Sequence, residues 1–117
     1  MEVLENFIKN NINTIKQLEK RMVVNGFKFC EIVENSRDGG YVSYSNWLGT
    51  KIVYFTFLPD YDIQVVHQKN LLKFLFTKDK RDDFISYREL LGSKIEFATR
   101  KQFFEEGLNF MIANGYI

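Results

Sequence analysis

The sequence predicts an α+β fold, in which an antiparallel β-meander of four to five strands carries N-terminal and C-terminal helices packed on one face. Apolar residues recur at three- and four-residue spacing over residues 3–24 and again near the C-terminus, as in amphipathic helices. Between these segments, apolar and polar residues alternate with the period of two that a half-buried strand requires. The length of 117 residues predicts one domain, residues 1–117, large enough to bury a core without disulfides.

Both long helices are predicted from an apolar stripe followed by an Asn-Gly pair. Asn25-Gly26 ends the first helix and Asn114-Gly115 ends the last, because glycine readily adopts the left-handed conformation of a helix terminus. Thr99-Arg100-Lys101-Gln102 has capping-box spacing and is expected to open the last helix. The stripes comprise Leu4, Phe7, Ile8, Ile12, Ile15, Leu18 and Met22 in the first helix, and Phe104, Leu108, Met111 and Ile112 in the last.

A strand is predicted over Phe27 to Glu34, although its alternation is imperfect. Phe27, Phe29 and Val33 share one face with Glu31, whereas Cys30 and Ile32 point the other way. A β-bulge would reconcile the pattern, but the sequence does not locate it.

The central feature is a hairpin of Tyr41 to Leu48 and Lys51 to Leu58, with Gly49-Thr50 as a two-residue type II′ turn. That turn sets the register and separates an apolar face from a mixed one. On the apolar face it pairs Val42 with Phe57, Tyr44 with Phe55, and Asn46 with Val53. On the mixed face it pairs Ser43 with Thr56, Ser45 with Tyr54, and Trp47 with Ile52.

Shorter elements complete the prediction. Asp62 to Gln68 is a strand that places Ile63 and Val65 on the apolar face and Gln64 opposite Thr56. The run Leu71 to Phe76 fits a strand or a helix, with a strand favoured. Lys78 to Asp83 is a charged loop, and Asp82 or Asp83 caps a short helix over Phe84 to Leu91. Ile95 and Phe97 belong to a brief strand.

Composition and charge exclude several classes of protein. Sixteen basic residues against fifteen acidic ones leave a net charge of +1, too small for a long-range attraction to nucleic acid or an anionic membrane. One cysteine precludes an intrachain disulfide and suits a reducing compartment. The N-terminus does not resemble a signal peptide, and no apolar run is long enough to span a bilayer. These features favour a cytoplasmic protein without membrane contact.

No catalytic or metal-binding pattern stands out, so we expect neither an enzyme nor a cofactor. His67 is interpreted as a partly buried structural residue, and Cys30 as a core or inert thiol. A metal site is not expected, since a zinc site needs several Cys or His ligands and the chain has two such residues. Glu105 and Glu106 are adjacent on a helix and diverge, which does not suit paired-carboxylate catalysis.

The mixed face of the sheet is the candidate binding surface. Aromatic rings among hydroxyls are typical of protein interfaces, because Tyr and Trp offer a large area and a polar handle. Few basic residues accompany them and the ribonucleoprotein aromatic motif is absent, which argues against nucleic acid. The predicted aromatic anchors are Tyr41, Trp47 and Tyr54, and their polar surround is Ser43, Ser45, Thr56, Gln64 and Gln68. The loop Lys78 to Asp83 is the alternative anchor.

In size, α+β layout, aromatic richness and lack of catalytic motifs, the chain resembles the small immunity proteins that bacteria keep beside polymorphic or contact-dependent toxins. The resemblance implies that the protein neutralises a cognate toxin domain by steric occlusion. The chain differs in charge from inhibitors of nucleases, which are often acidic, because its net charge is +1. Two alternatives remain: a ligand-binding or hydrolase-like domain with a pocket near His67, and a phage or mobile-element protein that binds a host defence component. Edge strands could also pair two copies of the chain.

Overall fold

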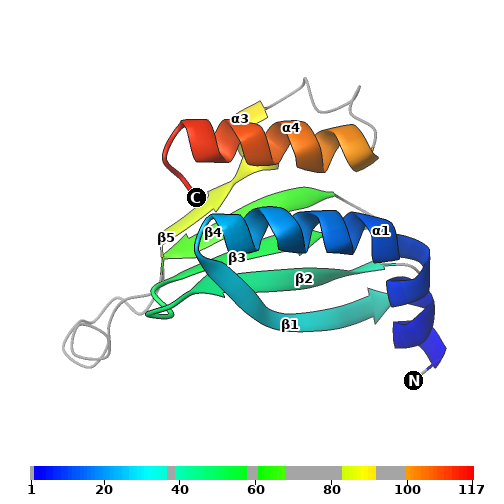
Figure 1. The fold of residues 1–117 in the computed structure, drawn as a ribbon. Coiled ribbons are helices and arrows are strands. Elements are labelled where there is room, and N and C mark those ends of the chain that lie inside the picture. The colour runs from blue at the N-terminus through cyan, green and yellow to red at the C-terminus, as the bar shows by residue number, and fades with distance from the viewer. Residues whose placement is uncertain (1, 37–38, 58–60, 68–82, 92–99) are drawn as a thin grey trace.

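The computed structural model describes residues 2–36, 39–57, 61–67, 83–91 and 100–117 (Figure 1). Five antiparallel strands form one sheet in the order β1-β2-β3-β4-β5, so each strand pairs with its neighbour in the chain. The elements are α1 (Glu2–Val24), β1 (Phe27–Ser36), β2 (Gly39–Asn46), β3 (Lys51–Thr56), β4 (Asp62–His67), β5 (Asp83–Ser86), α3 (Tyr87–Leu91) and α4 (Arg100–Ala113). The predicted α+β meander with helices at both ends is confirmed.

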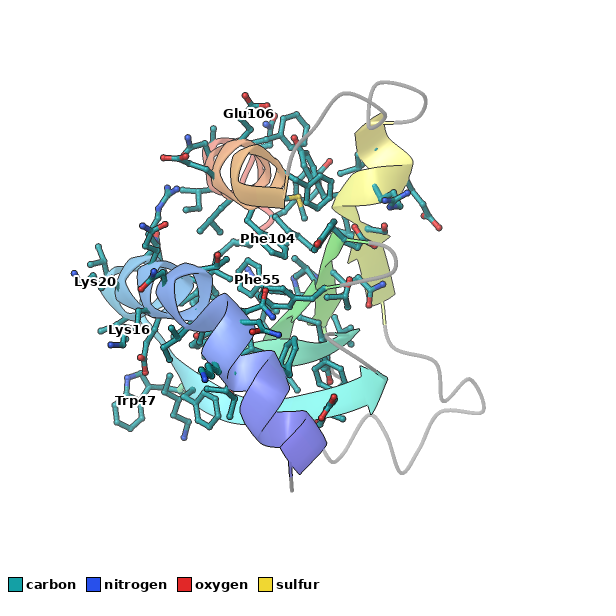
Figure 2. All side chains as sticks on the ribbon, turned by 90° about the vertical axis from the view of Figure 1, so that its right-hand side faces the viewer. Lys16, Lys20, Trp47, Phe55, Phe104 and Glu106 are labelled. Atoms are coloured by element: carbon teal, nitrogen blue, oxygen red, sulfur yellow. The ribbon has the colours of Figure 1, made fainter. Side chains whose placement is uncertain are left out.

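Helices α1 and α4 lie side by side on the same face of the sheet and run in the same direction (Figures 1 and 2). Each ends as the Asn-Gly pairs predict. Gly26 has φ of 86° and Gly115 has φ of 77°, the left-handed region that glycine occupies without strain. The side-chain amides of Asn25 and Asn114 each donate to the carbonyl four residues earlier, Arg21 O and Phe110 O.

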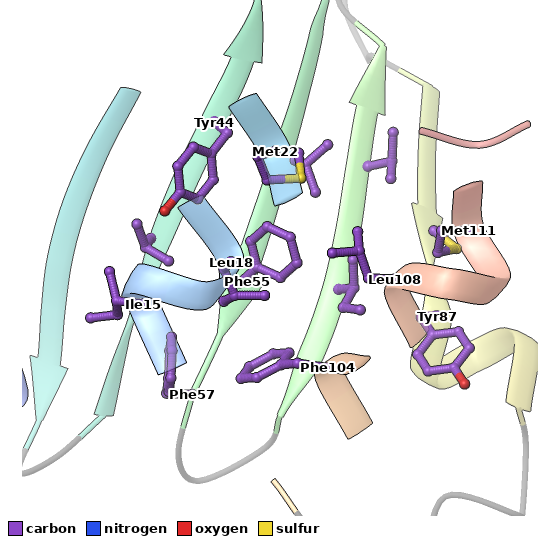
Figure 3. Packing of buried hydrophobic residues seen from close by; sticks show 14 of the residues in the cluster. Ile15, Leu18, Met22, Tyr44, Phe55, Phe57, Tyr87, Phe104, Leu108 and Met111 are labelled. Atoms are coloured by element: carbon purple, nitrogen blue, oxygen red, sulfur yellow. The ribbon is translucent and has the colours of Figure 1, made fainter. Parts of the chain in front are cut away.

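The core lies between the two helices and the sheet (Figure 3). The predicted apolar face is confirmed, because Val42, Tyr44, Val53, Phe55, Phe57, Ile63 and Val65 are all buried beneath the helices. Phe104 of α4 joins the layers, with its ring centroid 5.8 Å from that of Phe55 and 5.0 Å from that of Phe57. Burial of each such large side chain contributes about 1.5–3 kcal/mol.

The register of the central hairpin differs from the prediction by two residues. Val42 pairs with Phe55, Tyr44 with Val53, Ser43 with Tyr54, Ser45 with Ile52, and Tyr41 with Thr56. The predicted pairs of Val42 with Phe57, Tyr44 with Phe55, Asn46 with Val53, Ser43 with Thr56, Ser45 with Tyr54, and Trp47 with Ile52 are therefore wrong. The predicted pair of Gln64 with Thr56 is wrong in the same way. Gln64 pairs with Tyr54, and Thr56 pairs with Asp62. A shift of two keeps the side chains of the paired strand residues on their predicted faces, since side chains alternate with a period of two.

Asn46 explains the longer turn. Its side-chain Oδ1 accepts hydrogen bonds from Thr50 N (2.9 Å) and Lys51 N (3.2 Å), and its Nδ2 donates to Thr50 Oγ1 (3.0 Å). Gly49 N donates to Asn46 O, which closes a β-turn that begins at Asn46. The loop between the strands is therefore 47–50, and Trp47 lies in this loop rather than on the sheet.

A β-bulge at Cys30 accounts for the irregular alternation of β1. Phe29 pairs with Tyr44 but Glu31 pairs with Ser43, so Cys30 is the extra residue; a second irregularity lies between Glu34 and Ser36. Because of the bulge, the even-numbered side chains point toward the core beyond Cys30, whereas the odd-numbered ones do so before it. Ile32 therefore packs against the core. Cys30 is exposed, so its interpretation as a core thiol is wrong.

The segment predicted as a helix over Phe84 to Leu91 is partly wrong. Residues Asp83–Ser86 form β5, which pairs with β4 and places Ile85 opposite Val65. The helix begins only at Tyr87, where Ser86 Oγ accepts from Glu89 N (3.4 Å). The predicted cap at Asp82 or Asp83 is therefore replaced by Ser86. The predictions for Leu71 to Phe76, Ile95 and Phe97, the loop Lys78 to Asp82, and the side chains of Thr99 and Gln68 lie outside the described residues.

Gly107 allows α4 to approach the sheet closely. A Cβ at this position would clash with the Tyr87 ring and would lie 2.7 Å from Ile63 Cδ1. We predict that Gly107→Ala destabilises the protein by about 1–3 kcal/mol, because overpacking outweighs the gain of about 1 kcal/mol in helix propensity. Urea unfolding measures the change. The matched control is Glu106→Ala at the exposed neighbouring position, which should not lower stability appreciably. A more stable Gly107→Ala variant would contradict the close packing.

Candidate protein-binding surface

The face of the sheet opposite the helices is the candidate site, and we call it the outer face. Within the described residues, neither α1 nor α4 covers it (Figure 2). The pairing of β2, β3 and β4 places seven of its residues together: Tyr41, Ser43, Ser45, Tyr54, Thr56, Gln64 and Val66. Six of these are predicted contact residues. The sheet therefore brings together most of the predicted surface.

Tyr41 and Tyr54 form the centre of the outer face. Their rings pack edge to face with centroids 5.3 Å apart, and both side chains are partly buried. Tyr41 Oη donates a hydrogen bond to Glu31 Oε1 over 2.8 Å. The two rings are diagonal neighbours because Tyr41 lies opposite Thr56. The predicted register would have separated them, so the two-residue shift creates this aromatic pair.

The polar residues around the tyrosines differ in exposure. Ser43 and Ser45 are buried, and Ser43 Oγ donates to Glu31 O over 3.4 Å. Thr56 Oγ1 donates to Asp62 O over 3.4 Å, and Gln64 Nε2 donates to Asp62 Oδ2 over 3.2 Å. Thr56 and Gln64 are partly exposed, which leaves them accessible to a partner at the edge of the tyrosine pair.

Trp47 lies apart from the outer face, at the end of the molecule where the β2–β3 loop meets the end of α1. Its side chain is 81% exposed, and Lys28 Nζ lies 5.4 Å from its ring centroid, which is a cation–π contact. Four further apolar side chains at this end are exposed: Val23, Val24, Phe29 and Leu48. They lie at one end because α1 stops just before β1, and Phe27 at the start of β1 pairs with Asn46. We call these five residues the apolar end.

Sequence reasoning missed the apolar end except for Trp47. Five of the seven large apolar side chains that are exposed in the described residues belong to it; the others are Leu90 and Phe110. A signal was present, since Val23 and Val24 fall after the last residue of the helical stripe, and Leu48 adjoins the predicted turn. The sequence alone did not show that the end of α1 and the β2–β3 loop lie at the same end of the sheet.

A buried carboxylate on β4 was also missed. Asp62 accepts four hydrogen bonds: Oδ1 from Ile63 N (2.8 Å) and Arg88 N (2.9 Å), and Oδ2 from Ser86 Oγ (2.6 Å) and Gln64 Nε2 (3.2 Å). Arg88 also returns a hydrogen bond from Nε to Tyr61 O. These bonds tie α3 to β4. The arrangement is structural, because the carboxylate is buried and its donors come from the protein itself.

His67 and Cys30 occupy positions without evident chemistry. His67 ends β4 on the same face as Ile63 and Val65 and is partly buried, as interpreted from the sequence. Among the described residues, no group of three or more His, Cys, Asp or Glu side chains could hold a metal ion. A cleft between α1 and α4 is lined by residues of these two helices and not by His67. No helix in the described part of the chain is long and apolar enough to cross a membrane.

No protein-family model matches the sequence, and neither a curated protein nor a solved structure matches the chain.

Two tyrosines on β2 point to opposite faces and offer a matched test. The hydrogen bond to Glu31, followed by burial, raises the pKa of Tyr41 from 10.0 to about 12. The unfolded chain then loses the Tyr41 proton first, so stability falls as pH rises from about 10 through 12. We predict that Tyr41→Phe reduces this loss, measured by urea unfolding at pH values across that interval. An unchanged pH dependence would show that Tyr41 does not hold its proton through Glu31.

At neutral pH the hydroxyl of Tyr44 is expected to lower the stability of the protein, whereas that of Tyr41 is expected to raise it. Burial raises the pKa of Tyr44, and within the described part of the chain its hydroxyl has no hydrogen-bond partner. An unsatisfied buried hydroxyl costs free energy, so we predict that Tyr44→Phe stabilises the protein by about 1 kcal/mol. Tyr41→Phe, which breaks a partly exposed hydrogen bond, should cost no more than about 1 kcal/mol under the same conditions. A clear loss of stability in Tyr44→Phe would contradict the assignment of its hydroxyl as unpaired.

Proposed function

We propose that this protein is a non-enzymatic protein-binding module whose contact surface comprises the apolar end together with the outer face. The apolar end carries the proposal. Exposed large apolar side chains are normally scattered, whereas here five of the seven exposed in the described residues share one end of the molecule. Their transfer from water into a partner's interface is favourable, and Trp and Tyr dominate the binding energy of such interfaces.

The proposed surface is largely organised before binding. The Tyr41 and Tyr54 rings pack against each other, Trp47 contacts Lys28, and Asn46 fixes the loop that carries Trp47. Side chains held in place lose less conformational entropy on association than free ones do. The net charge of +1 supports recognition by shape and aromatic anchors rather than by a strong electrostatic field.

The partner in this proposal is a toxin domain, which the protein neutralises by covering its active site or a necessary surface. The resemblance to small bacterial immunity proteins supports this choice, as does the absence of a recognisable catalytic motif in the sequence. A phage or mobile-element protein that binds a host defence component would use the same kind of surface, and the identity of a captured partner separates the two. A hydrolase-like domain near His67 is the alternative of a different class, and it predicts that no macromolecule is retained.

The decisive experiment captures the partner from the native host and then compares two apolar substitutions. We predict that Trp47→Ala weakens binding by about 2 kcal/mol or more, roughly thirtyfold in Kd, because it removes the aromatic anchor of the apolar end. Isothermal titration calorimetry measures the affinity, and circular dichroism verifies the fold.

The matched control is Leu90→Ala on α3, which truncates an exposed apolar side chain outside the apolar end and should leave binding unchanged. Wild-type Trp47 is the only tryptophan in the chain, so its fluorescence should shift to shorter wavelength in the complex. Equal affinity of the Trp47→Ala and Leu90→Ala variants would contradict the proposed anchor.

A further inference from the structure

A cleft of about 330 Å³ lies between α1 and α4, on the helix side of the sheet and away from the outer face. Its α1 wall consists of Thr14, Gln17, Leu18, Lys20 and Arg21, and its α4 wall consists of Phe104, Glu105 and Leu108. From Thr14 to Arg21 it spans two helical turns, about 10 Å at 1.5 Å per residue. The volume equals about eleven waters at ~30 Å³ each, so it suits a ligand with on the order of ten non-hydrogen atoms.

The floor of the cleft is apolar and rigid. Leu18, Phe104 and Leu108 are all buried and belong to the core, and Phe104 points from α4 toward Phe55 of the sheet (Figures 2 and 3). Core side chains are held by close packing, so the floor exists before any ligand arrives. An apolar, largely preformed cleft with a few polar groups at its rim is the usual form of a small-molecule site.

The rim has a cationic end. Arg21 Nη2 donates to Asn109 Oδ1 over 2.6 Å, which holds the guanidinium across the gap between the helices. A guanidinium has five N–H donors, and this bond uses one of them. Lys20 adds a second positive charge at the same end, on the solvent side of α1 (Figure 2). The fixed guanidinium is suited to bind a carboxylate through charge-assisted hydrogen bonds.

Glu105, the one acidic group among the described residues that line the cleft, sets the orientation of a ligand. Because α1 and α4 run in the same direction and Arg21 meets Asn109, Glu105 lies one helical turn back, about 6 Å from the cationic end along the axis. A negative charge there disfavours an anion at the Thr14 end. The carboxylate of a ligand therefore belongs at Arg21, and its apolar chain lies along the floor.

We infer that this cleft binds a small aliphatic carboxylate, with its head group at Arg21 and its chain on Leu18, Phe104 and Leu108. The inference is independent of the proposed protein-binding function, because none of these residues belongs to the apolar end or the outer face. Octanoate, which has ten non-hydrogen atoms, is the probe. Octan-1-ol and octylammonium present the same chain with a neutral or a positive head.

Isothermal titration calorimetry with the intact protein tests the inference. We expect saturable binding of one octanoate per chain and binding of octylammonium at least about tenfold weaker, since the cationic end repels it. Thr14→Trp should abolish octanoate binding by filling the cleft. Its matched control is Asn13→Trp, an exposed neighbour outside the cleft, which should bind as the wild type does. No saturable binding to the wild type, or equal binding by the two tryptophan variants, would overturn the inference.

A second pair of variants separates the charge of Arg21 from its bridge to Asn109. Arg21→Gln should weaken octanoate binding by about tenfold and leave octan-1-ol binding unchanged. Asn109→Ala breaks the bridge but keeps the guanidinium, so octanoate binding should persist. Equal weakening by both variants would assign the effect to the bridge and would overturn the role of Arg21 as the carboxylate ligand.

Discussion

The burial of one face of the sheet beneath α1 and α4 is the constraint on which the rest of the structure depends. Val42, Tyr44, Val53 and Phe55 have no solvent exposure, and their alternation with outward residues leaves each strand only one acceptable face. A slip of one residue would expose these side chains and bury the Tyr41–Tyr54 pair. Both the core and the outer face therefore follow from the same alternation.

Alternation explains why the faces could be predicted although the register could not. The apolar pattern of β2, β3 and β4 is unchanged by a shift of two residues, so it assigns Tyr41 and Tyr54 outward in either register. The register itself depends on Asn46, whose side chain takes the hydrogen bonds of Thr50 N and Lys51 N. Propensity favoured a two-residue glycine turn, and this local side-chain capping outweighed it.

Two other differences between the predicted and the observed fold arise from pairing partners that are distant in sequence. The bulge at Cys30 becomes visible only when β1 is aligned with β2. Strand β5 is short and pairs with β4. Because of this pairing, and because Asp62 accepts hydrogen bonds from Ser86 Oγ and Arg88 N, the helix begins only at Tyr87. The candidate surface shows the same limit, because the exposed residues of the apolar end come from α1, β1 and the β2–β3 loop.

Inter-strand backbone NOEs measured by NMR test the central constraint most directly. The burial of one face with the observed register predicts NOEs that join Val42 with Phe55 and Tyr44 with Val53. Direct amide–amide NOEs that join Val42 with Tyr54 or with Thr56 in place of Phe55 would contradict it, because an odd shift turns the apolar face of one strand outward and removes the common core.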